Sequence, residues 1–535
     1  MVASKIVLAY FTAWSIYARS FFVTDIPVDK LTHINYAFAN IGSDGRIALG
    51  DPWADTDKTF DGDTWNQPLR GNFNQLNKLK ATYPNLRTLI SVGGWTWSGK
   101  FSDIALTDQS RSIFAASCVE FIQKYGFDGV DLDWEYPVSG GLSGNIQRPE
   151  DKQNYVLLLK EIRRQLDAVP NKKYLLTVAT GAGTERIGDM DLLGMLAYLD
   201  WFNVMTYDFH GGWETKTGHN APLYKNNDET TSDVAPSYIK SRYNCDAAIQ
   251  AYIRAGVPST KILMGLPLYG RGWKGVTSTA LNGFSQTASS QLPRGTWENG
   301  VYDYDDLKRS YISSNQRYWD DQSKVPFLFN PSTGLWITYN DVQSIDIKNN
   351  YIKQNNLGGG FFWELSSDRQ AELIGLTYNA LNNGVEPSST TASASSSNSP
   401  TTINNVKTTT QSSTQGIIRQ WQTNYAYSVN DLVMYQGKIY KCRQGHRSQL
   451  DWIPPDVLAL WLPISSPSTN PTIIESVTAT TQPSNQGNVS QWQVGYSYSV
   501  NDLVMYQGRK YQCRQPHRSQ ADWTPPDVPA LWLQI

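Results

Sequence analysis

The chain has 535 residues, which is long enough for one large domain and additional smaller modules. Its 46 Lys and Arg residues nearly balance its 48 Asp and Glu residues and form no basic tract, so we expect no nucleic-acid partner. No apolar run approaches the ~20 residues that a membrane-spanning helix needs, so we also expect a soluble protein without a membrane partner.

The first predicted strand lies at the start of the chain, in MVASKIVLAYF. Its apolar run before Thr12 is too short for the core of a signal peptide and is typical of a strand. If the protein is exported, we therefore expect that a leader has been removed or that export is non-classical.

Eight short apolar runs before residue 385 predict strands, and several are separated by segments with apolar residues at helical spacing, such as SRSIFAASCVEFIQKYG and DKQNYVLLLKEIRRQLDA. The runs are KIVLAYF, LTHINYAFAN, RTLISVGG, DGVDLDWE, KYLLTVAT, WFNVMTYD, KILMGLPLYG and GGGFFWEL. This alternation favours an α/β fold, a (β/α)8 TIM barrel, with a doubly wound open sheet as the alternative. The gap between the last two runs is much longer than most others. It predicts an α+β insertion subdomain at about 274–348, with strand-like VPFLFN and GLWITYN.

The last part of the chain contains a tandem repeat. Residues 420–464 recur as residues 491–535 with an offset of 71, and 34 of the 45 aligned positions are identical. Ser/Thr-rich residues 385–419 separate the first copy from a domain at 1–384, and residues 465–490 separate the two copies; both segments predict flexible linkers. Each copy is short and rich in aromatic residues, and we expect a small all-β module.

The stretch DGVDLDWEYP at 128–137 places four carboxylates in a run whose other residues are mainly apolar. Side chains alternate along a strand, so three of the acids should share one face and three bulky residues the other. The acids are Asp131, Asp133 and Glu135, and the bulky residues are Leu132, Trp134 and Tyr136. Same-face residues lie roughly 6.5 to 7 Å apart, so Glu135 should reach the C-terminal mouth of a barrel, where barrel enzymes hold their active sites.

Crowded carboxylates do not all ionise readily, so a proton should be shared among them and the pKa of Glu135 should rise toward that of a general acid. A calcium or magnesium site is the alternative chemistry, although strand spacing does not wrap a cation. A solvated acidic strand at the surface is a further alternative, which the apolar neighbours Val130 and Trp134 disfavour. Asp128 lies off the inward phase and is predicted to be structural.

These residues resemble a known family. DGVDLDWEYP matches the DxxDxDxE signature of glycoside hydrolase family 18, the chitinases. Four further segments are similar to motifs of that family in the same order: LISVGGW at 89–95, VMTYDFHGGW at 204–213, GLPLYGRGW at 265–273 and GGGFFWELSSD at 358–368. The resemblance covers about residues 5–380, and the insertion implies the deep-cleft subgroup. The two repeats resemble chitin-binding modules of carbohydrate-binding families 5 and 12.

The resemblance implies a substrate-assisted, retaining mechanism. Glu135 would protonate the glycosidic oxygen, and the N-acetyl carbonyl oxygen of the substrate would attack the anomeric carbon to give an oxazolinium ion. Asp133 would turn toward Glu135 and bond the acetamido N–H. Asp131 would hold the shared proton at rest, assisted by Ser91 and Tyr10.

The resemblance also implies which residues line the cleft. Tyr207 would donate a hydrogen bond to the acetamido oxygen, and Trp363 would form the floor under the distorted sugar, although core packing is the alternative for any tryptophan. The other substrate-binding residues expected in the cleft are Gly94, Trp95, Tyr136, Met205, Asp208, Trp213, Tyr269 and Arg271. His210 is interpreted as a mouth residue held by hydrogen bonds, because the carboxylates already supply the acid.

Each repeat contains three tryptophans. Trp421 and Trp461 lie beside apolar, strand-like residues and are predicted to be core residues. Trp452 and its counterpart Trp523 lie among polar residues close to a Pro pair, so we interpret them as exposed residues that stack on sugar rings. Two such modules on a flexible linker bind a polymer more tightly than one, which implies an insoluble polymer as substrate.

The sequence thus favours endo- or exo-hydrolysis of the β-1,4 linkages of chitin. A non-catalytic chitin lectin typically lacks the acid at Glu135, and an endo-N-acetylglucosaminidase for N-glycans would explain neither the insertion nor the repeats. We expect an extracellular monomer that binds chitin and chito-oligosaccharides, although the chain shows no signal peptide. The four cysteines are far apart and favour neither a zinc site nor disulfides, so we expect no metal and no other cofactor.

Overall fold

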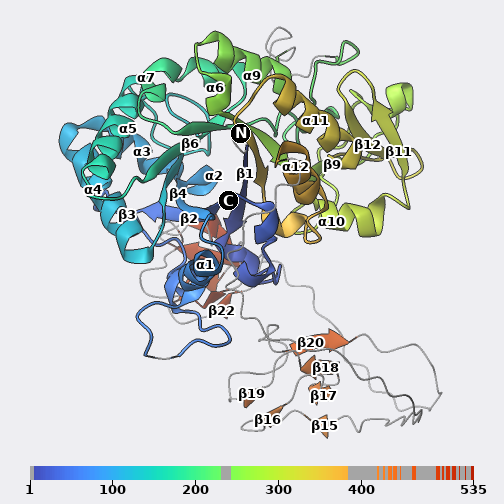
Figure 1. The fold of residues 1–535 in the computed structure, drawn as a ribbon. Helices are drawn as coiled ribbons and strands as arrows, with labels where there is room; N and C mark the ends of the chain where they lie inside the picture. The colour runs from blue at the N-terminus through green and yellow to red at the C-terminus, as the bar shows by residue number, and fades with distance from the viewer. Residues whose placement is uncertain are drawn as a thin grey trace, which may run out of the picture. The chain divides into compact units, whose positions relative to one another are not determined.

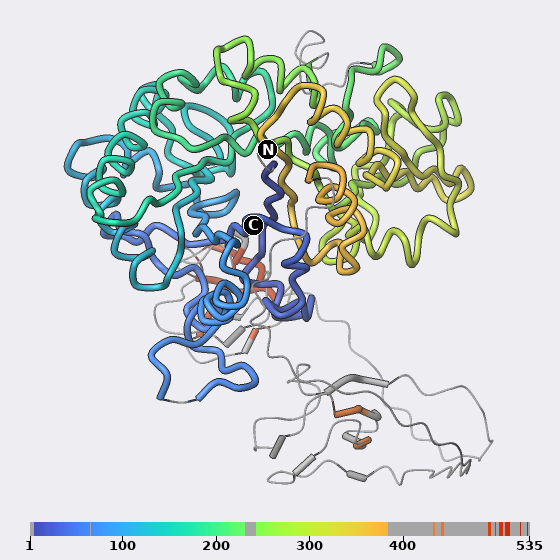
Figure 2. Tube along the Cα trace, in the orientation of Figure 1, coloured from blue at the N-terminus to red at the C-terminus, as the bar shows by residue number. Residues whose placement is uncertain are grey.

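The computed structural model of the protein describes residues 5–64, 66–230 and 242–382, and within 419–534 mainly the strands. The chain divides into two units, 1–415 and 416–535, which are described separately. Figure 1 shows the first unit as a ring of strands with helices around it, and Figure 2 traces the same path of the chain. The two predicted linkers lie almost entirely outside the described residues.

Eight parallel strands close into a barrel in the first unit as far as it is described. In spatial order they are β1 (Ile6–Thr12), β14 (Gly359–Trp363), β8 (Ile262–Pro267), β7 (Trp201–Met205), β6 (Leu175–Gly181), β5 (Gly129–Asp133), β4 (Arg87–Gly93) and β2 (His33–Ile41). The ring closes because β2 pairs in parallel with β1, and the short β3 (Ile47–Ala48) adds an antiparallel pair to β2. The predicted TIM barrel is therefore confirmed, and the open doubly wound sheet is wrong.

Helices cover the outside of the barrel (Figure 1). The described α-helices are α1 (Gly71–Thr82), α2 (Gly94–Trp97), α3 (Phe101–Leu106), α4 (Asp108–Tyr125), α5 (Asp151–Asp167), α6 (Thr184–Gly188), α7 (Leu192–Leu196), α9 (Cys245–Arg254), α10 (Tyr304–Asp306), α11 (Val342–Gln354) and α12 (Glu372–Asn382). The described 3-10 and π helices are η1 (Ala13–Ile16), η2 (Val23–Asp25), η3 (Val28–Lys30), η4 (Trp53–Asp57), η5 (Ser98–Lys100), η6 (Ser259–Lys261), η7 (Ala280–Gly283), η8 (Leu307–Tyr311) and η9 (Leu365–Ser367). Within the described residues, none of the helices has the length and apolar character needed to cross a membrane.

The helix predicted in SRSIFAASCVEFIQKYG forms α4, and its ends follow from local chemistry. The Thr107 hydroxyl accepts the N–H of Ser110 at 3.1 Å and so caps the first turn. Gly126 ends the helix with φ 84°, a left-handed conformation that favours glycine. Between them, Phe114, Cys118 and other apolar residues turn one face of the helix toward the barrel.

Strand residues alternate between two cores. Val7 and Phe11 of β1 belong to the large core between strands and helices, whereas Leu8 and Tyr10 point into the barrel. The barrel interior also contains fully buried polar residues, namely Asn35, Ser91, Asp131, Thr177 and Asn203. Polar groups at such depth need hydrogen-bond partners, so the barrel interior is the natural place to look for a site.

An insertion subdomain lies between β8 and β14 in the sequence. Its antiparallel sheet has the order β10 (Val301–Asp303), β9 (Tyr269–Trp273), β13 (Leu335–Thr338), β12 (Val325–Asn330) and β11 (Gln316–Asp320). The run KILMGLPLYG was predicted as one strand, but β8 ends at Pro267, whose missing N–H cannot continue the ladder. Tyr269 already begins β9, so the sheet starts before residue 274.

The second unit contains two sets of strands with the same pairing. The first set is β15 (Arg419–Gln420), β16 (Ala426–Tyr427), β17 (Leu432–Tyr435), β18 (Lys438–Cys442), β19 (His446–Arg447) and β20 (Trp461–Ile464). The second is β21 (Ser490–Gln491), β22 (Ser497–Tyr498), β23 (Leu503–Tyr506), β24 (Arg509–Cys513), β25 (His517–Arg518) and β26 (Trp532–Gln534). The prediction of two all-β modules is confirmed. Trp532, the counterpart of Trp461, is buried, whereas Trp421, Trp452 and Trp523 lie outside the described residues.

Candidate active site

Asp131 lies in the middle of β5, between Ser91 of β4 and Thr177 of β6 in the strand register. Its carboxylate is fully buried and accepts four hydrogen bonds. Oδ2 accepts from the hydroxyls of Tyr10 and Ser91, each at 2.8 Å. Oδ1 accepts from the Thr177 hydroxyl at 2.6 Å and the Asn203 amide at 3.1 Å. Burial raises the pKa of Asp131, and the four donors act against that rise.

Asp133 ends β5 and is buried, but its Oδ1 has no hydrogen-bond partner among the described residues. Burial raises the pKa of Asp133 well above its usual range, and the nearby charges of Glu135 and Asp131 raise it further. The resemblance assigns the shared proton to Asp131, which stays a prediction, and the raised pKa values of both acids are compatible with a proton shared between them.

Glu135 is half-buried and lies just beyond the end of β5. Its N–H donates to the Ser98 hydroxyl at 2.8 Å, and its carbonyl accepts the Asn145 amide at 3.0 Å. Burial raises the pKa of Glu135 to about 7. A hydrogen bond with Tyr136 acts against this rise, and the charge of Asp208 adds to it. A carboxyl with this pKa can donate a proton near neutral pH. Asp131, Asp133 and Glu135 together are called the carboxylate column below.

The predicted alternation along this stretch holds through Trp134 and fails at Tyr136. Trp134 points outward and stacks on Phe101, with ring centroids 5.3 Å apart. Strand alternation placed Tyr136 on that same outer face, whereas the resemblance placed it in the cleft; the side chain packs against the cluster inside the barrel. The reason is that β5 ends at Asp133, so strand alternation no longer governs the residues that follow it.

A second charged group stands beside the column, after the end of β7. Asp208 Oδ1 accepts the Tyr269 hydroxyl at 2.7 Å and the Arg271 Nε–H at 2.6 Å. The N–H of Asp208 donates to Asn220 Oδ1 at 2.9 Å, which fixes its backbone at φ 58°. The Arg271 guanidinium also lies over the Trp213 ring, 4.8 Å from its centroid. These sequence-predicted residues are therefore brought together.

Aromatic residues line the barrel interior and its rim. Trp363 ends β14 and is stacked on Phe38, with ring centroids 5.7 Å apart, while Tyr10 lies 5.4 Å away. Tyr207 is half-buried and contacts Phe361 and Tyr269, and Met205 is packed in the same interior cluster. Trp95 and Trp213 are 51% and 53% exposed, and although Arg271 covers one face of the Trp213 ring, both residues leave ring surface open to a ligand.

Gly94 contributes space rather than a functional group. It takes φ 72°, and a Cβ atom there would lie 2.6 Å from the Phe38 ring, which itself stacks on Trp363. Any larger residue would therefore push Phe38 against Trp363.

Several residues at the site were not predicted from the sequence. Thr177 and Asn203 complete the set of donors around Asp131, and Ser98 and Asn145 hold the backbone of Glu135. Further aromatic residues were also missed: Trp14 and Phe38 contact Trp363, and Tyr17 follows Trp14 on the same segment. Trp14 and Tyr17 directly follow β1, so the rule that barrel sites form after the C-terminal ends of strands could have found them.

His210 is held away from the chemistry. Its Nδ1 lies 2.7 Å from Glu214 and its Nε2 lies 3.2 Å from Glu229. Burial lowers the pKa of His210, but the hydrogen bonds and charges of these two carboxylates outweigh burial and raise the pKa to about 9. A cation fixed between two acids is a poor proton acceptor, so the geometry supports the interpretation of His210 as a mouth residue held by hydrogen bonds.

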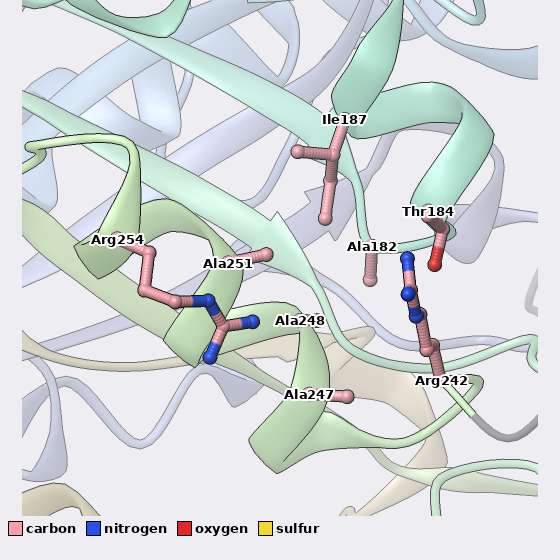
Figure 3. A pocket seen from close by; sticks show the side chains of 8 residues that line it. All are labelled: Ala182, Thr184, Ile187, Arg242, Ala247, Ala248, Ala251 and Arg254. Carbon is pink, nitrogen blue, oxygen red and sulfur yellow. The ribbon is translucent and has the colours of Figure 1, made fainter.

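A separate cavity of about 380 Å³ lies between α6 and α9 (Figure 3). It is lined by Ala182, Ile187 and Ala248 with the exposed arginines Arg242 and Arg254, and none of these residues belongs to the predicted site. Among the described residues, no group of three or more His, Cys, Asp or Glu side chains has an arrangement that could hold a metal ion.

The chain is similar to known proteins over most of its length. The model of glycosyl hydrolases family 18 matches residues 6–368, and that of carbohydrate-binding module family 5/12 matches residues 420–462 and 491–533. Chitinase A1 of Niallia circulans is 37% identical in an alignment that covers 98% of this chain and 93% of that protein.

Two solved structures show the same similarity. Chitinase ChiA74 from Bacillus thuringiensis is 39% identical with a TM-score of 0.65, and the match covers 71% of this chain and 70% of that chain. The catalytic domain of the psychrophilic chitinase B from Arthrobacter TAD20 is 33% identical with a TM-score of 0.66, covering 72% of this chain and 97% of that one.

Proposed function

Because this chain belongs to glycosyl hydrolases family 18, we propose that it hydrolyses the β-1,4 linkages of chitin by a substrate-assisted mechanism that retains the anomeric configuration. The observation that carries the proposal is the carboxylate column. Its innermost member, Asp131, is fixed by four donors, and its outermost member, Glu135, is half-buried with its pKa raised to about 7. An acid of that strength beside an open aromatic rim suits proton donation to a bound polysaccharide.

In the first step Glu135 donates its proton to the glycosidic oxygen, and the bond between that oxygen and the anomeric carbon breaks. The acetamido carbonyl oxygen of the same sugar forms the new bond to the anomeric carbon and produces an oxazolinium ion. Asp133, turned toward Glu135, accepts a hydrogen bond from the acetamido N–H, and the Tyr207 hydroxyl donates to the acetamido oxygen. These contacts strengthen as positive charge develops on the ring.

In the second step water gives a proton to the Glu135 carboxylate while its oxygen attacks the anomeric carbon and opens the oxazolinium ring. Two inversions at one carbon give net retention. A protein carboxylate is the alternative nucleophile, and Asp208 is an acid outside the column whose charge acts on Glu135. Its Oδ1 already accepts Tyr269 and Arg271, which supports the substrate as the source of the nucleophile.

The aromatic residues would bind the polymer chain along the cleft. The Trp363 ring would lie under the distorted sugar, and the exposed rings of Trp95 and Trp213 would stack on neighbouring sugars through their axial C–H groups. Trp14 adjoins Trp363, with ring centroids 6.4 Å apart, and would extend the row on its side. A row of this length favours long chains over short ones.

The proposal is tested by comparing release of soluble oligosaccharides from chitin by the wild type, by Glu135→Gln and by Glu120→Gln. Glu120 lies on the outer face of α4, where it pairs with Arg46, and serves as the control. We expect Glu135→Gln to lose about 10²–10⁴-fold in rate, since general acid catalysis contributes that much, and Glu120→Gln to remain active. Equal release by wild type and Glu135→Gln would refute the assigned acid. Binding without release by the wild type would instead support a lectin.

We propose further that the two modules attach the enzyme to insoluble chitin through Trp452 and Trp523, and that the protein acts outside the cell as a monomer. The support for attachment is the match of both repeats to a carbohydrate-binding family. Co-sedimentation of the full chain with chitin tests it. Replacement of both tryptophans by alanine should leave most of the protein in the supernatant, whereas unchanged sedimentation would contradict the role of these residues.

A further inference from the structure

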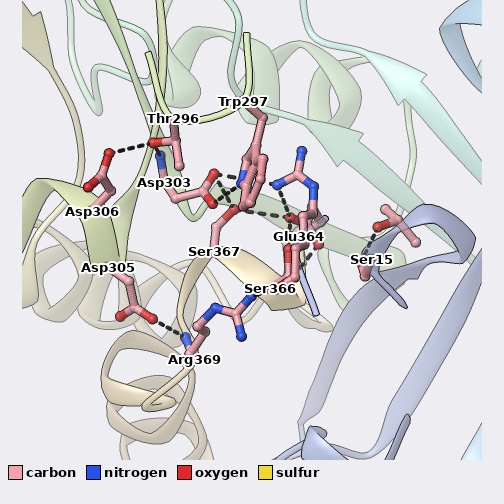
Figure 4. A network of polar contacts seen from close by, with 12 residues as sticks. Ser15, Thr296, Trp297, Asp303, Asp305, Asp306, Glu364, Ser366, Ser367 and Arg369 are labelled. Atoms are coloured by element: carbon pink, nitrogen blue, oxygen red, sulfur yellow. Dashed lines mark hydrogen bonds and ion pairs between the residues drawn. The ribbon is translucent and has the colours of Figure 1, made fainter. Parts of the chain in front are cut away.

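A buried network of charged and polar side chains connects the insertion subdomain to the strand that carries Trp363 (Figure 4). Asp303 contributes from the end of β10, and Glu364 contributes from the residue after Trp363. Arg19, from the segment after η1, lies between the two acids, with Nη1 3.3 Å from Glu364 and 3.6 Å from Asp303. The mechanism proposed above uses none of these three side chains.

Trp363 is paired in the barrel sheet on one side only, with β8, because the pairing of β14 with β1 ends at Phe362. It is the last residue of β14, and its partner in β8 is Pro267, which has no N–H to donate. The Trp363 carbonyl accepts the Leu268 N–H at 2.8 Å, and one face of the ring stacks on Phe38. The next fixed point along the chain is the buried carboxylate of Glu364.

Glu364 is fixed by donors from its own turn and from Arg19. Its Oε1 accepts the Ser366 hydroxyl at 2.6 Å and lies 3.1 Å from the Ser367 hydroxyl, while its Oε2 accepts the Ser366 N–H at 3.0 Å. Asp303 shares two of these groups. Its Oδ1 lies 3.1 Å from the Ser367 hydroxyl and 3.6 Å from Arg19. Arg19 and Ser367 therefore bridge the two carboxylates.

Asp303 also fixes Trp297 of the subdomain. The Trp297 Nε1–H donates to Asp303 Oδ2 at 2.7 Å, and the Arg19 guanidinium lies 5.2 Å from the centre of the Trp297 ring. On the backbone side, the N–H of Asp303 donates to the Thr296 hydroxyl at 3.0 Å. The polar groups around Asp303 thus come from the subdomain, from Ser367 beyond Trp363 and from Arg19 after η1.

The carboxyl of Asp303 is buried, where a charge is costly even with partners. Burial raises the pKa of Asp303 to about 6. The charge of Arg19 acts against this rise, and the charge of Glu364 adds to it. The charged groups that face it are Arg19 and Glu364, and Asp305 and Asp306 follow on its own segment. Since the folded pKa lies above the usual value, the contribution of this group to stability is present at low pH and is lost as pH rises through about 6. A buried charge that lowers stability at neutral pH is a candidate for a functional role.

We propose that Asp303 is a positioning residue for Trp363: its ionised carboxylate, acting through Arg19 and Ser367, holds the Trp363–Glu364 segment in the orientation that forms the floor of the cleft. The inference rests on the proposed function, in which Trp363 binds a sugar. The insertion subdomain would then contribute to the site indirectly, because its residue Asp303 sets the position of Trp363 on the barrel.

The test replaces Asp303 by asparagine, which has the shape of the protonated acid and still accepts from Trp297, but carries no charge for Arg19. With soluble chitohexaose as substrate, kcat/KM of Asp303→Asn should be about tenfold below that of the wild type at pH 8. A loss of this size corresponds to the contribution that a hydrogen bond to a charged group typically makes. The difference should shrink toward none at pH 4.5, where wild-type Asp303 is itself protonated. Asp321→Asn, in the same subdomain with a side chain 84% exposed, should match wild type at both pH values.

Two results would overturn the proposal: equal kcat/KM for wild type and Asp303→Asn at pH 8, or a deficit of the same size at both pH values, which marks a merely structural role. Thermal unfolding at pH 8 should show Asp303→Asn at least as stable as wild type. Arg19→Gln should give a similar deficit, and combining it with Asp303→Asn should add little; additive effects would mean that the pair does not act as a unit.

Binding separates this inference from the proposed function. Calorimetry measures the affinity for chitohexaose of Glu135→Gln, with and without Asp303→Asn, at pH 8 and pH 4.5. No hydrolysis is needed to detect the pH-dependent difference between the two variants. Weaker binding only at high pH supports the positioning role whether or not the wild type cleaves chitin. Equal binding at both pH values would contradict it.

Discussion

Ser98 is predicted to control the position of the general acid. Its hydroxyl accepts the N–H of Glu135 at 2.8 Å and lies 2.8 Å from the carbonyl of Gly94 and 3.1 Å from that of Asp133. The side chain is fully buried, so no water replaces these contacts when the hydroxyl is removed. Ser98→Ala therefore leaves the backbone N–H of the acid without its partner.

The size of the effect follows from what is left unpaired. A buried donor or acceptor that loses its partner costs about 1–3 kcal/mol. If the backbone of Glu135 shifts to find another partner, the part of this free energy that reaches the transition state lowers kcat about tenfold for every 1.4 kcal/mol. We expect kcat to fall about ten- to a hundredfold, and the free energy of unfolding to fall by about 1–3 kcal/mol.

Ser117 provides a matched control. Its hydroxyl accepts the backbone N–H of Ile47 at 2.9 Å and donates to the carbonyl of Phe114 at 2.7 Å, it is buried, and it lies on α4 outside the site. Ser117→Ala should lose a similar free energy of unfolding in urea and keep the wild-type kcat on soluble chito-oligosaccharides. Wild-type kcat in Ser98→Ala, or an equal fall in both variants, would show that the hydrogen bond to Glu135 has no catalytic role.

Three further predictions concern the acid, the cleft floor and the modules. The pKa of Glu135 in the folded protein is raised to about 7, so its acid form predominates below that pH and is lost above it. A pH–rate profile on soluble chito-oligosaccharides should therefore show kcat/KM falling about tenfold per pH unit above pH 7. A profile that stays flat to pH 9 would contradict the assignment of Glu135 as the acid. Trp363→Ala should lose about 1.5–3 kcal/mol of transition-state binding, measured as kcat/KM, with Trp319→Ala on the subdomain sheet unaffected. Replacement of Trp452 and Trp523 together should reduce the rate on insoluble chitin and leave the rate on soluble oligosaccharides unchanged, and equal loss on both substrates would argue against attachment.

The strands of the barrel could be predicted because their signal is local. Each of the eight apolar runs contains one barrel strand, and alternation correctly places Asp131 and Asp133 on the inner side of β5 and Trp134 on the outer side. Alternation fails where the strand stops, as at Tyr136, because nothing local in DGVDLDWEYP marks Asp133 as the last paired residue. For the same reason one run was predicted where β8 and β9 are separate strands.

The partners of the acids could not be predicted, because they come from distant parts of the chain. Thr177 and Asn203 reach Asp131 only once β6 and β7 stand beside β5, and Ser98 reaches Glu135 from the turn that follows β4. In the sequence alone, these side chains cannot be distinguished from ordinary strand or turn residues, because their partners depend on the register of the strands. The bridge between Asp303 and Glu364 likewise depends on how the subdomain meets the barrel.

The central claim is that the substrate supplies its own nucleophile. The direct measurement compares hydrolysis of two aryl glycosides of chitobiose that differ only in the N-acyl group of the sugar at the bond cleaved, acetyl in one and trifluoroacetyl in the other. Fluorine withdraws electrons from the carbonyl oxygen, so the account predicts a rate for the trifluoroacetyl substrate that is lower by orders of magnitude. Equal rates would mean that a carboxylate of the protein, and not the acetamido oxygen, attacks the anomeric carbon.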